Sequence, residues 1–356
     1  MKERMRICFQ RYQFNHTMRG LYLALLLLIC SCQNGIKEKQ ISFYYWRTDF
    51  NISAREQLCL DSLHAKTLYI RLFDLDTITR SDKHIDIIPI SKITNSENST
   101  SRNIVPVVYM TREAILYASD TDSMAARIAR LVQQMTKEYQ WHFDEIQWDC
   151  DWTPKTKQLY FDLLKKLRYQ PIFSNKKFSA TIRLHQIKHR SMAGIPPVDK
   201  GLLMCYNMGN LKEYGHRNSI FEAEIAADYL KHLSTYPLNL DIALPLFQWT
   251  VWFRDQRFKG LIRDVNEQSV VNNPNFIQAK EHLYSCQSDT AWLDYHFQKG
   301  DELRFESVSI DQLMKFSNDL RGRTHHDSMT ILFFHLSPDI LKNYPAYELQ
   351  KIVDQL

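Results

Sequence analysis

The sequence predicts an α/β fold, a closed (β/α)8 TIM barrel, on three observations. Eight short apolar segments alternate, for the most part, with amphipathic patterns of helical length. This alternation requires a parallel sheet covered by helices, because parallel strands are joined by long crossover connections. The chain has 356 residues, a length that one barrel with insertions can fill. An open doubly wound sheet is the alternative, but no glycine-rich phosphate-binding motif follows a predicted strand.

The predicted strands are short apolar runs bounded by polar residues. In chain order they are Ser42–Thr48, Thr67–Leu75, Ile104–Tyr109, Glu145–Asp151, Phe178–Leu184, Gly201–Asn207, Leu238–Phe247 and Met329–Leu336. The predicted helices carry apolar residues three and four positions apart. They are Ser53–His64, Ser123–Tyr139, a helix that starts at Thr153-Pro154, Ile220–Leu233 and Ser309–Leu320. The first and last of these open with capping boxes, Ser53-x-x-Glu56 and Ser309-x-x-Gln312.

Two stretches lack this alternation. Residues 76–102 are polar and rich in serine and asparagine, which predicts a long loop after the second strand. Residues 259–308 form a long insert between the seventh and eighth strands. Within it, Trp292–Gln298 and Glu302–Val308 flank Lys299-Gly300-Asp301 and predict a small β-hairpin. Both stretches follow strand carboxyl ends, the face on which barrels carry their active sites.

The amino terminus has the features of an export signal. The formal charge is +5, but five basic residues and one acid lie within residues 1–31, which leaves 40 basic and 39 acidic residues in the remainder. This near-neutral remainder offers no basic face for nucleic acid. The apolar run Leu21–Cys30 is too short to span a bilayer and is typical of a secretory signal. Met18 is an alternative start to Met1, because a complete short signal follows it.

The end of this signal resembles the processing site of bacterial lipoproteins. The small residue Ser31 precedes Cys32, and Ile29 lies three positions before Cys32. The resemblance implies that residues 1–31 are a signal peptide and that residues 32–40 are the lipidated Cys32 and a polar tether, with a plain cleaved signal as the alternative. Residues 41–356 then form a single barrel domain of an exported protein, lipid-anchored to the cell envelope. The outer membrane is the expected location, and its periplasmic and surface faces both stay open.

Besides Cys32, four cysteines remain after processing: Cys59, Cys150, Cys205 and Cys286. Their spacing contains no C-x-x-C pair, so neither a zinc site nor a redox motif is predicted. Their apolar surroundings predict buried free thiols. No metal and no cofactor is expected.

The strongest chemical signal is the segment FDEIQWDCDW, from Phe143 to Trp152. Successive strand side chains point to opposite faces, so Gln147, Asp149 and Asp151 are expected to point into the barrel. Two acids at the end of a buried strand are costly unless they are hydrogen-bonded or used in chemistry. Neighbouring carboxyl groups shift each other's pKa values apart, so that one holds a proton, as cleavage of a glycosidic bond requires. Capping or bracing of a loop is the structural alternative.

This segment resembles the fourth-strand signature D-x-x-D-x-D-x-E of the chitinase-like glycoside hydrolases of family 18. Asp144 and Asp149 match its first and third acids, Gln147 replaces the second, and Asp151 stands at the position of the catalytic glutamate. Three later segments also resemble the family's strands five to seven: Phe178-Ser179-Ala180-Thr181, Met204-Cys205-Tyr206-Asn207 and Ala243-Leu244-Pro245-Leu246-Phe247. The family's third-strand S-x-G-G and its eighth-strand tryptophan are missing. An uncharacterised group of bacterial barrel lipoproteins has similar fourth strands.

The resemblance implies substrate-assisted hydrolysis of a carbohydrate, such as an N-acetylated cell-envelope glycan. Carried over by position, Asp151 is the acid/base, Asp149 orients the acetamido nucleophile of the substrate, and Tyr206 donates a hydrogen bond, with Asn207 nearby. The change from glutamate to aspartate shortens the side chain, and a displacement of about 1 Å costs on the order of a hundredfold in rate. A non-catalytic glycan-binding or structural lipoprotein is therefore the alternative to an enzyme.

Further side chains at the expected barrel mouth are candidates for contacts with a glycan. Aromatic rings stack on sugar faces, and polar groups bind sugar hydroxyls. The candidates are Trp46, Asp74, Asp76, Gln147, Gln248 and Trp249. Bracing of loops is the alternative for the two acids, and burial in the core is the alternative for the tryptophans. His335, near the end of the eighth strand, is predicted to be a core histidine.

Overall fold

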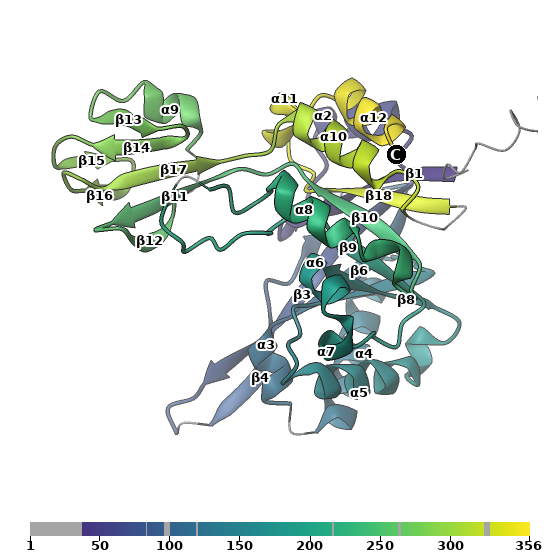
Figure 1. Ribbon diagram of the computed structural model, residues 1–356. Coiled ribbons are helices and arrows are strands. Elements are labelled where there is room, and N and C mark those ends of the chain that lie inside the picture. The colour runs from purple at the N-terminus through teal and green to yellow at the C-terminus, as the bar shows by residue number, and fades with distance from the viewer. Residues whose placement is uncertain are drawn as a thin grey trace, which may run out of the picture. The chain divides into compact units, whose positions relative to one another are not determined.

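The structure is a computed structural model, and it describes residues 38–356 except 83, 96–99, 119, 216, 263–264 and 324–327. Eight parallel strands form its main sheet, in the spatial order β1-β18-β10-β9-β8-β7-β6-β3, and β1 also pairs with β3 (Figure 1). Their bounds are β1 (Glu38–Tyr45), β3 (Thr67–Thr79), β6 (Asn103–Met110), β7 (Glu145–Cys150), β8 (Lys177–Arg183), β9 (Lys200–Met204), β10 (Leu240–Pro245) and β18 (Ser328–Phe334). The predicted closed (β/α)8 barrel is confirmed, and each strand overlaps a predicted one.

The first strand begins earlier than the sequence indicated. β1 starts at Glu38 and pairs in parallel with β18 from Glu38↔Ser328 to Phe43↔Phe333. Residues 38–40 of the predicted tether therefore belong to the barrel. The predicted signal, residues 1–31, and Cys32 lie outside the described residues. In the part of the chain that is described, no helix has the length and apolar character to cross a membrane.

The connecting helices form where the amphipathic patterns lie. α2 (Ala54–Ser62) and α10 (Ile310–Leu320) begin at the two predicted capping boxes, and α4 (Thr121–Glu138) and α8 (Ala223–Leu230) also overlap predicted helices. α5 (Lys157–Arg168) starts later than expected, because residues 153–156 form a turn. The other described helices outside the insert are α3 (Arg112–Leu116), α6 (Leu184–Lys188), α7 (Arg190–Ala193), α11 (Ile340–Asn343) and α12 (Ala346–Asp354), with 3-10 turns at Pro171–Phe173 and Leu233–Thr235.

The polar stretch after the second barrel strand contains a β-hairpin. β3 continues to Thr79, and the antiparallel strand β4 (Ile85–Ile90) pairs with its end, from Asp74↔Ile90 to Thr79↔Ile85. The prediction of a loop over residues 76–102 is wrong in this part, because the isoleucine-rich segment 85–90 has a strong preference for strand. Asp49–Phe50 (β2) and Thr94–Asn95 (β5) form a further short pair.

The insert between β10 and β18 folds into a five-stranded antiparallel sheet with the order β12-β11-β17-β14-β13. Its elements are β11 (Trp249–Arg254), β12 (Arg257–Ile262), α9 (Glu267–Val271), β13 (Phe276–Lys280), β14 (Leu283–Cys286) and β17 (Glu302–Glu306). The predicted hairpin across Lys299-Gly300-Asp301 is wrong, because β17 pairs with β11 and β14 instead. A small hairpin does occur in the insert, between β15 (Thr290–Trp292) and β16 (Tyr295–Phe297).

The amino-terminal end of the barrel interior holds a network of paired charges. Lys200 Nζ lies 2.7 Å from Asp241 Oδ2 and 2.9 Å from Glu145 Oε2. Ser179 Oγ and Tyr69 Oη donate to Glu145 Oε1 at 2.6 and 3.2 Å. A cavity of about 1360 Å³ opens at this end and reaches Tyr69, Glu145 and Lys200. Each of these charges is neutralised by a neighbour, as buried charges require. We therefore interpret the network as structural.

Candidate active site at the carboxyl ends of the strands

The alternation predicted for the fourth barrel strand is present in β7. Trp148 packs on Phe173 and Phe178, with ring centroids 5.5 and 5.3 Å apart, on the side of the connecting elements. Asp149 lies on the opposite face, where it accepts a hydrogen bond from Thr181 Oγ1 of β8 at 2.7 Å. Gln147, one layer deeper, is fully buried and accepts a hydrogen bond from the Tyr44 hydroxyl. The strand thus carries its polar side chains into the barrel.

Asp149 is a buried carboxyl group with 5% exposure. Burial raises the pKa of Asp149 to about 7, and the neighbouring Asp151 carboxylate also raises it, against the opposing effects of the Thr181 hydrogen bond and the Arg183 charge. Desolvation is the largest cause, as expected for a carboxyl group inside a barrel. Near neutral pH this group therefore exchanges a proton with its surroundings.

Asp151 follows β7 and is bound by Arg183, the last residue of β8. The Arg183 Nε donates to Asp151 Oδ1 at 2.5 Å, and its Nη2 donates to Oδ2. This is the parallel two-bond arrangement that guanidinium and carboxylate groups favour. The Asp151 side chain is 41% exposed and the Arg183 side chain 20% exposed, so the pair lies at the mouth of the barrel. The position that the resemblance assigns to the acid/base is thus occupied by an ion-paired carboxylate.

Tyr206 and Asn207 follow β9. The Tyr206 hydroxyl is buried and has no hydrogen-bond partner among the described residues, and burial and the nearby Asp149 raise the pKa of Tyr206. Its ring packs between Phe247 and Phe334, with centroids 5.7 and 5.5 Å away. Asn207 is exposed and has φ of 54°, a backbone conformation that asparagine adopts more readily than most residues.

Aromatic rings continue this cluster across the mouth. The ring centroid of Trp46, which follows β1, lies 5.6 Å from that of Phe334 at the end of β18. The ring centroid of Trp249, at the start of β11, lies 5.1 Å from that of Phe247. Both tryptophans are half-buried. The mouth therefore combines partly accessible rings with a buried carboxyl group and a buried phenol.

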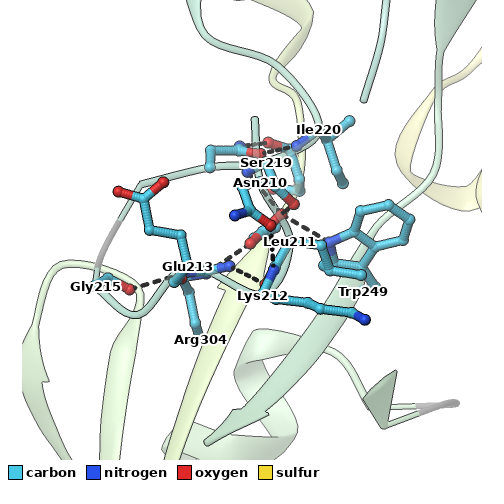
Figure 2. A network of polar contacts seen from close by, with 12 residues as sticks. Asn210, Leu211, Lys212, Glu213, Gly215, Ser219, Ile220, Trp249 and Arg304 are labelled. Atoms are coloured by element: carbon cyan, nitrogen blue, oxygen red, sulfur yellow. Dashed lines mark hydrogen bonds and ion pairs between the residues drawn. The ribbon is translucent and has the colours of Figure 1, made fainter. Parts of the chain in front are cut away.

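Trp249 is held in place by a buried ion pair of the insert (Figure 2). Its indole Nε1 donates to Glu306 Oε2 at 2.7 Å, and Glu306 Oε1 accepts from Arg304 Nε at 2.6 Å. Ser219 donates to the same Glu306 oxygen through its backbone N and its Oγ. The remaining Arg304 donors bind carbonyl oxygens of the loop after β9, those of Leu211, Glu213 and Gly215.

Several solved structures are similar to this chain, among them the following two. The spore cortex-lytic enzyme SleL of Bacillus cereus has 13% sequence identity over 90% of this chain and 75% of that chain, with a TM-score of 0.51. A mutant of catalytic domain 2 of the Group II chitinase of Ostrinia furnacalis, in complex with penta-N-acetylchitooctaose, has 12% identity over 89% of this chain and 96% of that chain, with a TM-score of 0.50. The chain has the fold of the chitinase-like glycoside hydrolases of family 18. No family model and no curated protein matches its sequence.

Other predicted contact residues of this barrel have different surroundings. Asp76 accepts hydrogen bonds from Thr77 N at 2.8 Å and Thr111 Oγ1 at 3.0 Å, so it braces the next loop. Asp74 is buried, lies 3.5 Å from Arg71 Nη1 and has one oxygen without a partner among the described residues. Gln248 is exposed beside Trp249. The Gln147 amide is engaged by Tyr44 and by Ser179 at 3.5 Å, which favours a bracing role.

Arg183 is the site residue that the sequence analysis missed. It was not identified because its partner lies 32 positions away in the chain. A signal was available in the alternation of β8, since Thr181 and Arg183 share one strand face, as Asp149 and Asp151 do. Arg304 and Glu306 were missed for a related reason, because the pairing of β17 was predicted incorrectly.

The four predicted thiols are confirmed as free and buried in the described part of the chain. Burial raises the pKa of Cys59 to about 11, which makes the thiol a poor nucleophile. Burial, with the charges of Arg47 and Arg71, lowers the pKa of His335 to about 4, which agrees with a neutral histidine. Within residues 38–356, outside the gaps given above, no cluster of histidine, cysteine or acidic side chains could hold a metal ion.

Proposed function

We propose that this protein binds a glycan at the carboxyl ends of its barrel strands. The observation that carries the proposal is a buried Tyr206 hydroxyl without a partner among the described residues, near the buried carboxyl group of Asp149. A buried donor left without an acceptor costs about 1–3 kcal/mol. The carbonyl oxygen of an acetamido sugar would remove that cost. The half-buried rings of Trp46 and Trp249 provide apolar faces for sugar stacking.

Binding without hydrolysis is favoured over the mechanism in which Asp151 is the general acid. A general acid has to carry a proton when the substrate is bound. Asp151 is engaged by Arg183 through both carboxylate oxygens, so neither oxygen is free to pass a proton to a substrate. The side chain is also one methylene shorter than the glutamate that the resemblance calls for.

Hydrolysis with exchanged roles is the second candidate. The raised pKa of Asp149, about 7, allows this residue to hold a proton at neutral pH, whereas Asp151 is paired with Arg183. Two neighbouring carboxyl groups in different environments are the arrangement expected of an acid and its charged partner. In this candidate, Asp149 donates its proton to the leaving oxygen as the glycosidic bond breaks, and the Asp151 carboxylate faces the positive charge that develops on the sugar. Water then adds to that sugar carbon and returns a proton to Asp149.

Titration of the wild-type protein with N-acetylchitotriose, with chromatography of the mixture for shorter products, separates the candidates. We expect saturable binding without products. Tyr206→Phe should bind about tenfold more weakly, whereas Tyr169→Phe, at an exposed tyrosine, should bind like wild type. Products that Asp149→Asn abolishes would establish the second candidate. Products that Asp151→Asn abolishes while Asp149→Asn retains them would contradict both, and absence of binding would contradict the proposal as a whole.

We also propose that the protein is exported and anchored to the cell envelope through a lipid on Cys32. The short apolar run, the preceding basic residues and Ser31 before Cys32 support this proposal. β1 begins at Glu38, only six residues after Cys32. A chain of that length spans at most about 20 Å when fully extended. The barrel would therefore stay close to the membrane surface that holds its anchor.

A further inference from the structure

Two arginine side chains lie beside the proposed glycan site, and each has an N–H donor without a hydrogen-bond partner among the described residues. Arg47 follows β1, and Arg71 lies on β3, which pairs with β1. The Nε atoms of both are buried and have no hydrogen-bond partner among the described residues. The Arg71 side chain is only 14% exposed. Leaving a buried charged donor without an acceptor costs more than leaving a neutral one.

The known contacts of these arginines hold the guanidinium groups without using the Nε donors. Among the described residues, Arg71 pairs with Asp74, Nη1 to Oδ2 at 3.5 Å, and its guanidinium carbon lies 5.4 Å from the centre of the Trp46 ring. Arg47 Nη2 donates to Glu56 Oε1 at 2.6 Å and to the Asn51 carbonyl at 2.9 Å. Each group is thus fixed in orientation, which lowers the entropy cost of binding an anion.

His335, which follows β18, is close enough to Arg47 and Arg71 for their charges to act on it. Its pKa is lowered to about 4 by burial and by the charges of Arg47 and Arg71. At neutral pH the imidazole is therefore uncharged, so the positive charge at this place comes from the two arginines. The depressed pKa agrees with a positive potential at this place, but the geometry of the two arginines supports the site independently.

This arginine cluster, formed by Arg47, Arg71 and His335, is continuous with the proposed glycan site. The centre of the Trp46 ring lies 5.4 Å from the Arg71 guanidinium carbon and 5.6 Å from the centre of the Phe334 ring, and Phe334 packs on Tyr206. Asp74, the partner of Arg71, is close enough to Asp149 to affect its pKa. A substituent on a sugar bound over Trp46 could therefore reach the guanidinium of Arg71.

We infer that the arginine cluster binds a carboxylate of the glycan, so that the ligand is an anionic oligosaccharide with carboxylate-bearing sugars. This inference rests on the proposed function and specifies its ligand class. Arginine is the side chain best suited to carboxylates, because its planar N–H groups match the two oxygens. A neutral oligosaccharide would leave the Arg71 Nε without an anionic acceptor and should bind more weakly.

The inference is tested with three trisaccharides that share one N-acetylglucosamine backbone. The first is unsubstituted, the second carries a 3-O-lactyl carboxylate on its central sugar, and the third carries the methyl ester of that group. Calorimetry of the full-length processed protein should give at least tenfold tighter binding of the carboxylate form than of the other two. Arg71→Gln should reduce this preference to less than twofold. Its circular dichroism spectrum should match that of wild type, which shows that the variant is folded.

Arg80→Gln is the matched control, because Arg80 is on the same hairpin but is exposed and paired with Asp86. It should keep the full preference for the carboxylate. Equal affinity of wild type for the three sugars would overturn the inference while leaving glycan binding intact. Equal loss of all three affinities in Arg71→Gln would also overturn it, because Arg71 would then have a structural role. Binding of none of the three would remove the proposed function, and the inference with it.

Discussion

Arg183 binds both carboxylate oxygens of Asp151 at the mouth of the barrel. This relationship distinguishes the site from one in which Asp151 serves as a proton donor. It also leaves the deeper Asp149, with its pKa raised to about 7, as the carboxyl group that titrates near neutrality. The electrostatics of the site therefore depend on three side chains at the ends of two adjacent strands.

Replacement of Arg183 by methionine is expected to raise the pKa of Asp149 further. The Arg183 charge lowers this pKa, and its removal also leaves the Asp151 carboxylate without its partner. A carboxyl-carbon NMR titration measures the change directly. Arg168→Met is the control, because Arg168 pairs with Asp199 at a more exposed position. An unchanged or lower pKa in Arg183→Met would contradict the electrostatic account of the site.

Asp149 makes the stability of the protein fall as the pH rises through the range between its unfolded and folded pKa values. The folded pKa of about 7 lies above the unfolded value of 3.8, so between these limits the folded state holds a proton that the unfolded state has lost. Asp149→Asn removes this effect. Urea unfolding should show the variant gaining stability relative to wild type between pH 4 and pH 7.

The matched variant for this titration is Asp144→Asn, at a fully exposed acid just before β7. It should follow the pH dependence of wild type. If Asp149→Asn instead loses stability relative to wild type as the pH rises from 4 to 7, the folded carboxyl group is ionised throughout, and its assignment as a titrating group is wrong.

The pair formed by Arg304 and Glu306 should contribute strongly to the stability of the insert. Both side chains are at most 2% exposed, and removal of one partner from a buried pair costs about 3–5 kcal/mol. Arg304→Met should therefore lower the free energy of unfolding by that amount and shift the fluorescence of Trp249, whose indole donates to Glu306. Lys342→Met, which breaks an exposed pair with Asp339, should cost less than about 1 kcal/mol. A similar loss in both variants would contradict the assignment.

Cys32 is expected to be the lipidated residue. In cells fed a labelled fatty acid, the wild-type protein should incorporate the label and sediment with membranes. Cys32→Ser should abolish both properties. Cys30→Ser should keep both, because Cys30 is preceded by the bulky Ile29. Labelling of Cys32→Ser would refute the anchor at this position.

The parts of the fold that follow local rules could be predicted from the sequence. The capping boxes at Ser53 and Ser309 depend on residues three positions apart, and the alternation of β7 depends on the geometry of one strand. The β3–β4 hairpin and the pairing of β17 could not be predicted in this way. Both depend on contacts between distant segments, for which hydrophobic pattern gives no partner.

The candidate site shows the same division. Asp149 could be identified because its strand places it inside the barrel with a strand-end acid beside it. The role of Asp151 could not be judged without Arg183, since a carboxylate and its counter-ion on another strand leave no joint pattern in the sequence. The unused donors of Arg47 and Arg71 likewise become visible only when all neighbouring atoms are known.

A crystal structure of the complex with N-acetylchitotriose tests the central claim most directly. We predict a sugar ring stacked on Trp46 or Trp249, with an acetamido oxygen within hydrogen-bond distance of the Tyr206 hydroxyl. A sugar bound at the amino-terminal cavity beside Lys200, or crystals that stay free of sugar at concentrations that saturate binding in solution, would contradict the placement of the site at the carboxyl ends of the strands.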